Sequence, residues 1–241
     1  MLELKNIFVS AKEKHFEIIN NVNLKLEEKK IYVVTGPNGG GKTSLAKAII
    51  GIYPVSSGTI ILDGEDITSS TVTMRAKKGI GYAFQAPPRF KGLRVRDILS
   101  IAAGDNDEKK LFSLLADVGL CAQDYIDREL NSSFSGGELK RVEIASILAR
   151  ELRVALFDEP EAGIDLWSFQ KLTETFKKLN EVSNTTIVII SHQERILRLA
   201  DEVILICGGK ITDVTSPDKF LGDIDYFTEP GCFCPHCYAR K

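Results

Sequence analysis

The stretch "IYVVTGPNGGGKTSLAKAIIG", Ile31–Gly51, decides the fold of this 241-residue chain. It begins as a buried strand, turns through a run of glycines, and continues as a helix that a glycine ends. Similar apolar runs recur along the chain with helix-like segments between them. Strands almost continuous in Val, Ile and Leu that alternate with helices are typical of a parallel sheet covered on both faces, so an α/β fold is predicted. The further strand-like runs are Gly58–Gly64, Val154–Pro160, Thr185–His192 and Glu202–Val214.

The segment over residues 86–150 interrupts this alternation. It has little strand character and carries apolar residues at helical spacing. We therefore expect one domain over residues 1–225, with a core formed by residues 1–85 and 151–225 around a mostly helical insert. Residues 226–241 form a tail of different character, rich in Cys, Pro and Gly and without periodicity.

The composition is ordinary for a soluble globular protein, with 44% hydrophobic and 27% charged residues and a formal net charge of -2. This balance argues against a nucleic-acid-binding domain, which is usually basic, so no nucleic-acid partner is expected. The longest aliphatic runs, such as Thr186–Ile190, are far shorter than the about 20 apolar residues of a membrane-spanning helix. The N-terminus lacks the basic head and apolar block of a secretory signal, so a cytoplasmic location is expected.

The run "GPNGGGKT", Gly36–Thr43, fits the pattern G-x-x-x-x-G-K-[ST] and has the required strand before it and helix after it. Its glycines let backbone N–H groups turn toward phosphate oxygens, and the helix start directs its positive dipole end to the same place. Lys42 supplies charge for the β- and γ-phosphates, and the Thr43 hydroxyl suits Mg²⁺. The sequence therefore predicts a nucleotide site. Its predicted contact residues are Gly36, Pro37, Asn38, Gly39, Gly40, Gly41, Lys42, Thr43 and Ser44.

Four polar residues follow other strand-like runs, at the strand ends where ligands bind in open α/β sheets. Asp158 is placed to hold Mg²⁺, and Glu159 to polarise the water that attacks the γ-phosphate. His192 is a candidate γ-phosphate contact, and the Gln85 amide is a candidate ligand of Mg²⁺ or of the water. The alternatives are an acidic surface turn and a structural histidine, but a shared sheet edge with the phosphate loop favours the catalytic interpretation.

A second helix start preceded by glycines lies at "SGGELKRVEIASILAR", Ser135–Arg150. Ser135, Gly136 and Gly137 offer a hydroxyl and backbone N–H groups to an anion. Because the chain already has a phosphate loop, we expect this second anion-binding edge to close on a nucleotide held by another copy.

In this order, the motifs resemble those of the ABC-type ATPases. The matching residues are the phosphate loop, Gln85, the signature "FSGGE", Asp158 with Glu159, the "AGID" run ending at Asp165, and His192. The resemblance covers about residues 1–221. It implies a phosphate-loop parallel-sheet core, an N-terminal antiparallel β element and a helical insert subdomain. It also implies a head-to-tail pair in which Ser135–Glu138 complete the ATP site of the facing copy, which Asp165 also touches.

Within this family, Phe134 and Glu138 replace the Leu and Gln of the commonest transporter signature. Together with "AFQAPP" and "SHQERIL", they are similar to the SufC-like ATPases of the Suf iron–sulfur cluster assembly system, which implies a soluble SufB/SufD-like scaffold as partner. The alternative is the nucleotide-binding subunit of a membrane transporter, with transmembrane partners. An ABC protein acting on DNA or ribosomes is disfavoured, because there is one motif set and no long coiled coil. Candidates for the adenine contact are His15 and Phe16.

Three of the five cysteines, Cys232, Cys234 and Cys237, crowd into the tail with a histidine among them. Three thiols and an imidazole can ligate Zn²⁺ or an iron–sulfur cluster, with a fourth ligand from a second chain. The alternative is a disordered, redox-sensitive tail. Cys121 and Cys207 have apolar neighbours in the sequence and are expected to be buried packing residues.

Overall fold

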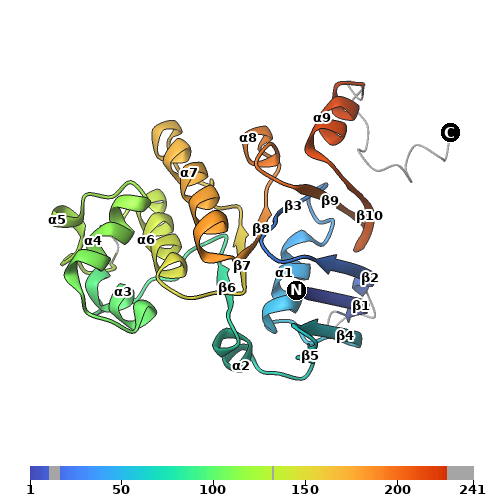
Figure 1. Ribbon diagram of the computed structural model, residues 1–241, viewed down its shortest axis with the longest axis horizontal. Coiled ribbons are helices and arrows are strands. Elements are labelled where there is room, and N and C mark those ends of the chain that lie inside the picture. Colours follow the sequence, from blue (N-terminus) through green and yellow to red (C-terminus); the bar gives the residue numbers. More distant parts are fainter. Residues whose placement is uncertain (11–16, 132, 227–241) are drawn as a thin grey trace.

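The strand of the opening stretch, β3 (Ile31–Thr35), lies inside a six-stranded sheet of strand order β10-β9-β3-β8-β7-β6 (Figure 1). The computed structural model describes residues 1–10, 17–131 and 133–226. Every neighbouring pair in this sheet is parallel except β9 and β10, which form the predicted hairpin. The other strands are β6 (Ile80–Ala83), β7 (Val154–Asp158), β8 (Thr186–Ile190), β9 (Glu202–Cys207) and β10 (Lys210–Thr215).

The central strands are buried along their whole length because both faces of the sheet are covered. All residues of β3, β7 and β8 are buried, as the continuous apolar runs predict. Successive side chains of a strand point to opposite faces, so Val33 joins the apolar core that contains Phe176, whereas Tyr32 and Val34 join the core that contains Leu45. The sheet thus separates two cores, and its strand ends form the edge that carries the candidate site.

An antiparallel sheet near the N-terminus has the strand order β2-β1-β4-β5. Its apolar side chains, among them Leu4, Ile19 and Ile60, enter the core that also holds Leu45 of the phosphate-loop helix. The predicted antiparallel element is therefore confirmed. Its strands are β1 (Leu2–Ser10), β2 (Glu17–Leu26), β4 (Ser57–Leu62) and β5 (Glu65–Asp66).

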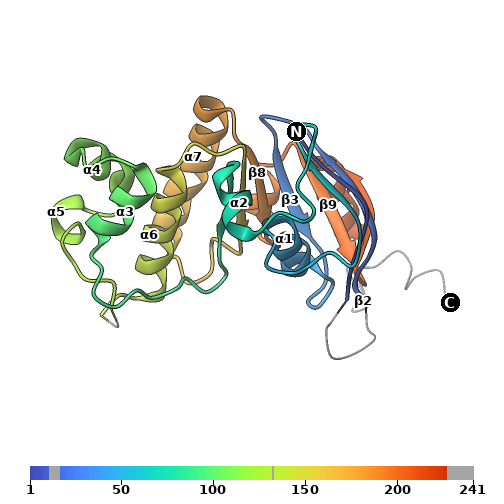
Figure 2. The ribbon, with the colours of Figure 1, turned by 90° about the horizontal axis from the view of Figure 1, so that it is seen from below.

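Four helices gather at the end of the molecule opposite this sheet, as Figures 1 and 2 show: α3 (Val95–Ala103), α4 (Glu108–Asp117), α5 (Ala122–Tyr125) and α6 (Gly136–Leu148). Three of them, α3, α4 and α6, lie where apolar residues recur at helical spacing, whereas the short α5 was not predicted. The division of the chain at residues 86 and 150 stays a prediction. Across the described residues, no helix has the length and apolar character needed to cross a bilayer. The remaining helices are α1 (Lys42–Ile50), α2 (Val72–Lys77), α7 (Leu166–Ser183), α8 (Glu194–Leu197) and α9 (Pro217–Tyr226).

The prediction of two buried cysteines was wrong. Cys121 is exposed at the start of α5, where its Sγ lies 3.3 Å from Gln123 Oε1. Cys207 is half-buried at the last position of β9, beside the Gly-Gly turn. Both residues stand at element ends, where a residue with buried apolar neighbours in the sequence can itself be left partly or fully exposed. The tail cysteines Cys232, Cys234 and Cys237, and the adenine candidates His15 and Phe16, lie outside the described residues.

Candidate active site

The phosphate loop connects β3 to α1 at the carboxyl edge of the parallel sheet. A Cβ added to Gly36 would lie 2.1 Å from the carbonyl oxygen of Ile206, so the loop approaches the end of β9 as closely as only glycine allows. The Gly40 N–H donates to the Pro37 carbonyl at 3.0 Å, and Gly41 precedes α1 with a φ of 108°. This tight loop holds the amino end of α1, and with it the first-turn residue Ser44, at the sheet edge.

Lys42 lies beneath the loop with only 7% of its surface exposed. Its Nζ donates to the carbonyl oxygens of Gly36 at 2.7 Å and Pro37 at 2.9 Å. Burial lowers the pKa of Lys42, and the charges of Glu159 and Asp158 act in the opposite direction. The ammonium therefore already sits between the loop and two carboxylates, where phosphate oxygens can replace the carbonyl acceptors.

Asp158 is fully buried at the end of β7, and both of its carboxylate oxygens have partners. The Thr43 hydroxyl donates to Oδ1 at 3.1 Å, and the Tyr82 hydroxyl donates to Oδ2 at 2.8 Å. Burial raises the pKa of Tyr82, so its hydroxyl remains a donor at neutral pH. The structure thus brings the predicted magnesium residues Thr43 and Asp158 into contact and adds Tyr82, which the sequence analysis missed.

These donors suit Mg²⁺ by their chemistry. The Thr43 hydroxyl, the Asp158 carboxylate and the nearby Gln85 amide all present oxygen atoms, which are the ligands that Mg²⁺ prefers. Magnesium bound with a nucleotide usually keeps several water and phosphate ligands and few protein ligands. The described part of the chain holds no cluster of three or more His, Cys, Asp or Glu residues that could hold a metal ion.

Glu159 and Gln85 meet at the same edge. Gln85 Nε2 donates to Glu159 Oε2 at 2.7 Å. The Glu159 N–H donates to the carbonyl of Ile190 in β8 at 3.0 Å, and Glu159 has a φ of 45°, which non-glycine residues seldom adopt. The neighbouring strand therefore holds Glu159 in a turn out of β7, which leaves its carboxylate beside Gln85.

His192 lies in the exposed turn that follows β8, two residues after the carbonyl that accepts the Glu159 N–H. Ser191 connects the segment after β8 to the turn after β7. Its hydroxyl donates to Glu161 Oε1 and accepts the Gln193 N–H at 3.0 Å. Burial raises the pKa of Glu161. The turns that follow β7 and β8 are thus joined, which places His192 and Glu159 on one rim.

The second predicted anion-binding edge is the capped start of α6. Ser135 Oγ accepts the Glu138 N–H at 3.2 Å, and Glu138 Oε2 accepts the Ser135 N–H at 2.7 Å, which together form a capping box. The Tyr125 hydroxyl also donates to Glu138 Oε1. The hydrogen bond from Tyr125, together with those from Ser135, lowers the pKa of Glu138 to about 2. The partners of this cap thus belong to the helical region and not to the phosphate loop.

The first turn of α6 lies against the segment that precedes α7. A Cβ on Gly137 would lie 2.4 Å from the Gly163 carbonyl, whereas a Cβ on Gly136 would meet nothing within 4 Å. Asp165 accepts the Ser168 N–H at 3.0 Å and the Ser168 hydroxyl at 2.7 Å, which closes the start of α7. The start of α6 and the segment that leads to Asp165 are therefore in contact, and Gly136 has open space where a side chain would stand.

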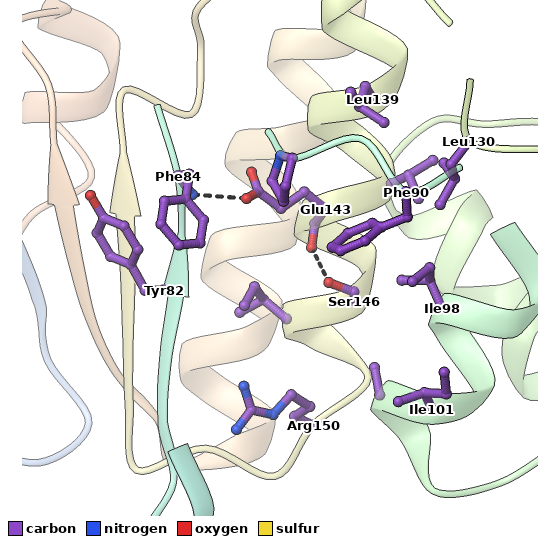
Figure 3. Close-up of a pocket in the computed structure, with 14 residues that line it drawn as sticks. Tyr82, Phe84, Phe90, Ile98, Ile101, Leu130, Leu139, Glu143, Ser146 and Arg150 are labelled. Carbon is purple, nitrogen blue, oxygen red and sulfur yellow. Dashed lines mark hydrogen bonds between the residues drawn. The ribbon is translucent and has the colours of Figure 1, made fainter. Parts of the chain in front are cut away.

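An apolar groove of about 390 Å³ lies beside the site, between α3 and α6 (Figure 3). Phe84, Phe90 and Ile101 line it and are 38%, 42% and 73% exposed. Phe84 directly precedes Gln85, so the groove wall continues into the sheet edge that carries Gln85 and Glu159. Exposed apolar surface of this kind marks interaction sites.

Comparison with known proteins places the chain in a family. The ABC transporter family profile matches residues 19–162, more than half of the chain. An uncharacterized ABC transporter ATP-binding protein of Methanocaldococcus jannaschii is 37% identical over 233 residues, which cover 93% of this chain and 90% of the relative. A probable ATP-dependent transporter, ycf16, of Cyanidium caldarium is 31% identical over 229 residues, which cover 88% and 89%.

Solved structures agree in fold. The ATP-binding cassette MJ0796, dimeric and bound to ADP and Pi, superposes with a TM-score of 0.82 at 23% identity and covers 90% of this chain and 99% of its own. The cbiO1 protein of Clostridium perfringens, part of the ABC transporter complex cbiONQ, has a TM-score of 0.77 at 25% identity, with 93% and 92% covered. Family profile, relatives and fold lead to one conclusion: the chain belongs to the ABC transporter family and is an ABC-type ATPase.

Proposed function

We propose that this chain is the ATP-hydrolysing subunit of a larger assembly, in which two copies close head to tail on ATP and thereby move a partner protein. The observation that carries this proposal is the presence of two separately preformed half-sites. The phosphate-loop edge is held by the bonds of Lys42 and Asp158, and the start of α6 by the capping box of Ser135. Each half-site is held in place by hydrogen bonds within its own region of the chain, as a site assembled from two copies requires.

ATP would enter the phosphate-loop half-site with its β- and γ-phosphates at the amino end of α1. Lys42 would then exchange the carbonyls of Gly36 and Pro37 for phosphate oxygens. Thr43 and Asp158 would hold Mg²⁺, whose charge, when it is bound, stabilises the phosphates during transfer.

Hydrolysis would take place at the rim that carries Glu159. Its carboxylate would orient the attacking water and accept its proton as the water oxygen bonds to the γ-phosphorus, while the bond from that atom to the bridging oxygen of ADP breaks. Gln85, already bonded to Glu159, would hold this carboxylate and reach the metal. His192 would contact the γ-phosphate from the next turn of the rim.

The facing copy would supply the second half-site. Ser135, Gly136 and Gly137 would direct a hydroxyl and the positive end of α6 at the γ-phosphate of the partner's ATP. Gly136 has open space where a side chain would stand, which leaves room for the approach of that phosphate. Asp165 would also contact the facing copy.

For the partner protein, the names of the relatives support the transporter interpretation, with transmembrane subunits docking on this chain. A SufB/SufD-like scaffold is the second candidate, favoured by resemblance at Phe134 and Glu138. In that setting, Cys232, Cys234 and Cys237 would hold Zn²⁺ or an iron–sulfur cluster.

Purification of the tagged chain from its native host, followed by identification of stoichiometric partners, tests the two candidates. A membrane protein recovered with the chain in detergent supports the transporter interpretation. A partner without membrane spans supports the scaffold. A chain that neither hydrolyses ATP nor pairs in its presence would contradict the proposed function as a whole.

A further inference from the structure

A buried lysine lies between the two catalytic loops. Lys140 stands in the second turn of α6, and its side chain is only 2% exposed. Its Nζ donates to the carbonyl oxygens of Phe84 and of Asp158, the second at 3.1 Å. Phe84 and Asp158 directly precede Gln85 and Glu159 in the chain. One ammonium group therefore joins α6 to the two segments that carry the catalytic pair.

Glu143, almost one turn further along α6, strengthens the same link. One of its carboxylate oxygens accepts the Phe84 N–H at 2.9 Å (Figure 3). The other lies 3.7 Å from Lys140 Nζ and is buried without a hydrogen-bond partner in the described part of the protein. Both main-chain polar groups of Phe84 are thus held by α6. Because Glu143 also lines the apolar groove, this link joins the groove to the catalytic rim.

Burial makes this arrangement costly unless the charges are compensated. It lowers the pKa of Lys140, while the nearby carboxylates of Glu143, Asp158 and Glu161 act in the opposite direction. Replacing a buried ion pair by apolar side chains of similar volume is often neutral for stability. The pair therefore adds little stability over an apolar replacement, whereas its hydrogen bonds to the main chain of Phe84 and Asp158 constrain those two segments.

We propose that Lys140 and Glu143 are positioning residues for ATP hydrolysis. Both residues bind the main chain of Phe84 and thereby fix the adjacent Gln85. Lys140 also binds the main-chain carbonyl of Asp158 and thereby fixes the start of the turn that carries the Glu159 carboxylate. The 2.7 Å contact between the two catalytic side chains depends on this link. The inference deepens the proposed function and rests on the role assigned there to Glu159.

The test compares steady-state ATP hydrolysis by full-length variants. Lys140→Met removes both bonds to main-chain carbonyls, and we expect kcat to fall roughly ten- to hundredfold, the range that a displacement of about 1 Å can cause. The KM for ATP and the affinity for a fluorescent ATP analogue should change by less than about twofold, since the phosphate loop is untouched.

Glu143 provides a second pair of variants. Glu143→Gln keeps an oxygen acceptor for the Phe84 N–H, and we expect its kcat to stay within about threefold of the wild type. Glu143→Leu removes the acceptor at similar volume and should reduce kcat as Lys140→Met does. This contrast between conservative and apolar replacement is not expected if Glu143 merely fills space.

Arg150→Met is the matched control. Arg150 follows the same helix, is partly buried and donates to a main-chain carbonyl, that of Ala76, at 2.8 Å. Its carbonyl partner lies at the end of α2, so the variant loses a comparable bond without loosening the catalytic rim. We expect its kcat to remain that of the wild type.

The outcomes separate the inference from the proposed function. An active wild type and an inactive Glu159→Gln variant, together with full kcat in Lys140→Met and Glu143→Leu, would overturn only the inference. An equal loss in Arg150→Met would also overturn it, since the effect would then be general destabilisation. Full turnover by Glu159→Gln would overturn the catalytic assignment itself. If Lys140→Met does not fold, Lys140→Arg, expected to retain partial kcat, and Glu143→Leu carry the test.

Discussion

Gln85 and Glu159, which lie 74 positions apart in the sequence, are joined by a 2.7 Å hydrogen bond at the carboxyl edge of the parallel sheet. Gln85 follows β6 and Glu159 follows the adjacent strand β7, so the bond connects two neighbouring turns of one rim. The apolar groove is lined by Phe84, the residue that directly precedes Gln85. Movement of this segment would therefore change the surroundings of the Glu159 carboxylate directly.

The first prediction concerns Glu159→Gln. The amide cannot act as a base toward the attacking water, so we expect ATP to bind with ordinary affinity while turnover falls at least about a hundredfold. Because bound ATP is then not consumed, two copies should remain closed on it. Size-exclusion chromatography with light scattering should show an ATP-dependent dimer that ADP does not produce. Wild-type turnover by this variant would remove Glu159 from its role.

The second prediction tests the composite site. Lys42→Ala removes the ammonium of one half-site, and Ser135→Arg places a bulky cation in the other. Each variant alone should be inactive, whereas a mixture should regain activity, because a mixed dimer contains at most one intact composite site. Hydrolysis rates measured across mixing ratios should pass through a maximum. Normal hydrolysis by Ser135→Arg alone would contradict action on the facing copy.

Much of this site could be predicted from the sequence because its signals are local. An apolar run followed by glycines and Lys42, or by two carboxylates, places those residues at a strand end. Contacts made by distant residues carry no such signal: Lys140 and Phe84 are 56 positions apart, and Tyr82 and Asp158 are 76 apart. Lys140 follows the signature in a helix of mixed polarity, where a lysine ordinarily indicates a solvated face.

The choice of partner could not be settled from the sequence for a different physical reason. Glu138, one of the two residues behind the Suf-like interpretation, closes the capping box with Ser135 and accepts a bond from Tyr125. Phe134 is buried against the same tyrosine, with ring centroids 5.9 Å apart. Both residues thus act within their own copy and stabilise the start of α6, a role compatible with any partner.

The third prediction concerns Tyr82→Phe. The variant keeps the ring and removes only the bond to Asp158 Oδ2, so it should fold normally. Residues that orient a metal ligand typically contribute about ten- to hundredfold to metal affinity, and we expect the Mg²⁺ concentration for half-maximal hydrolysis to rise within that range. Tyr32→Phe is the control: it removes the hydroxyl that accepts the Glu27 N–H at 2.8 Å, at the end of β3 opposite the phosphate loop. An unchanged magnesium dependence would contradict the role of Tyr82.

The fourth prediction uses two adjacent glycines. Gly137→Ala would place a methyl group 2.4 Å from the Gly163 carbonyl, so α6 and the segment before α7 must separate, at a cost of about 1 to 3 kcal/mol in the free energy of unfolding. Gly136→Ala meets open space and should leave stability within about 0.5 kcal/mol of the wild type or raise it. Urea unfolding measures both. Equal stabilities would show that the two segments are not in contact.

The fifth prediction concerns the pH dependence of stability that Glu143 imposes. Burial raises the pKa of Glu143 from 4.5 to about 7, so the folded chain binds this proton more tightly than the unfolded chain does. The resulting stabilisation is fully present below pH 4.5 and is lost as the pH rises through 7.

The stability of the wild type, relative to that of Glu143→Gln, should therefore fall by up to roughly 3 kcal/mol between pH 5 and 8. Urea unfolding of both proteins across this range measures the difference. Glu138→Gln is the matched control: the pKa of Glu138 is about 2, so this carboxyl titrates below the window and the corresponding difference should stay flat. A flat difference for Glu143→Gln as well would mean that Glu143 stays ionised in the folded protein, held so by Lys140.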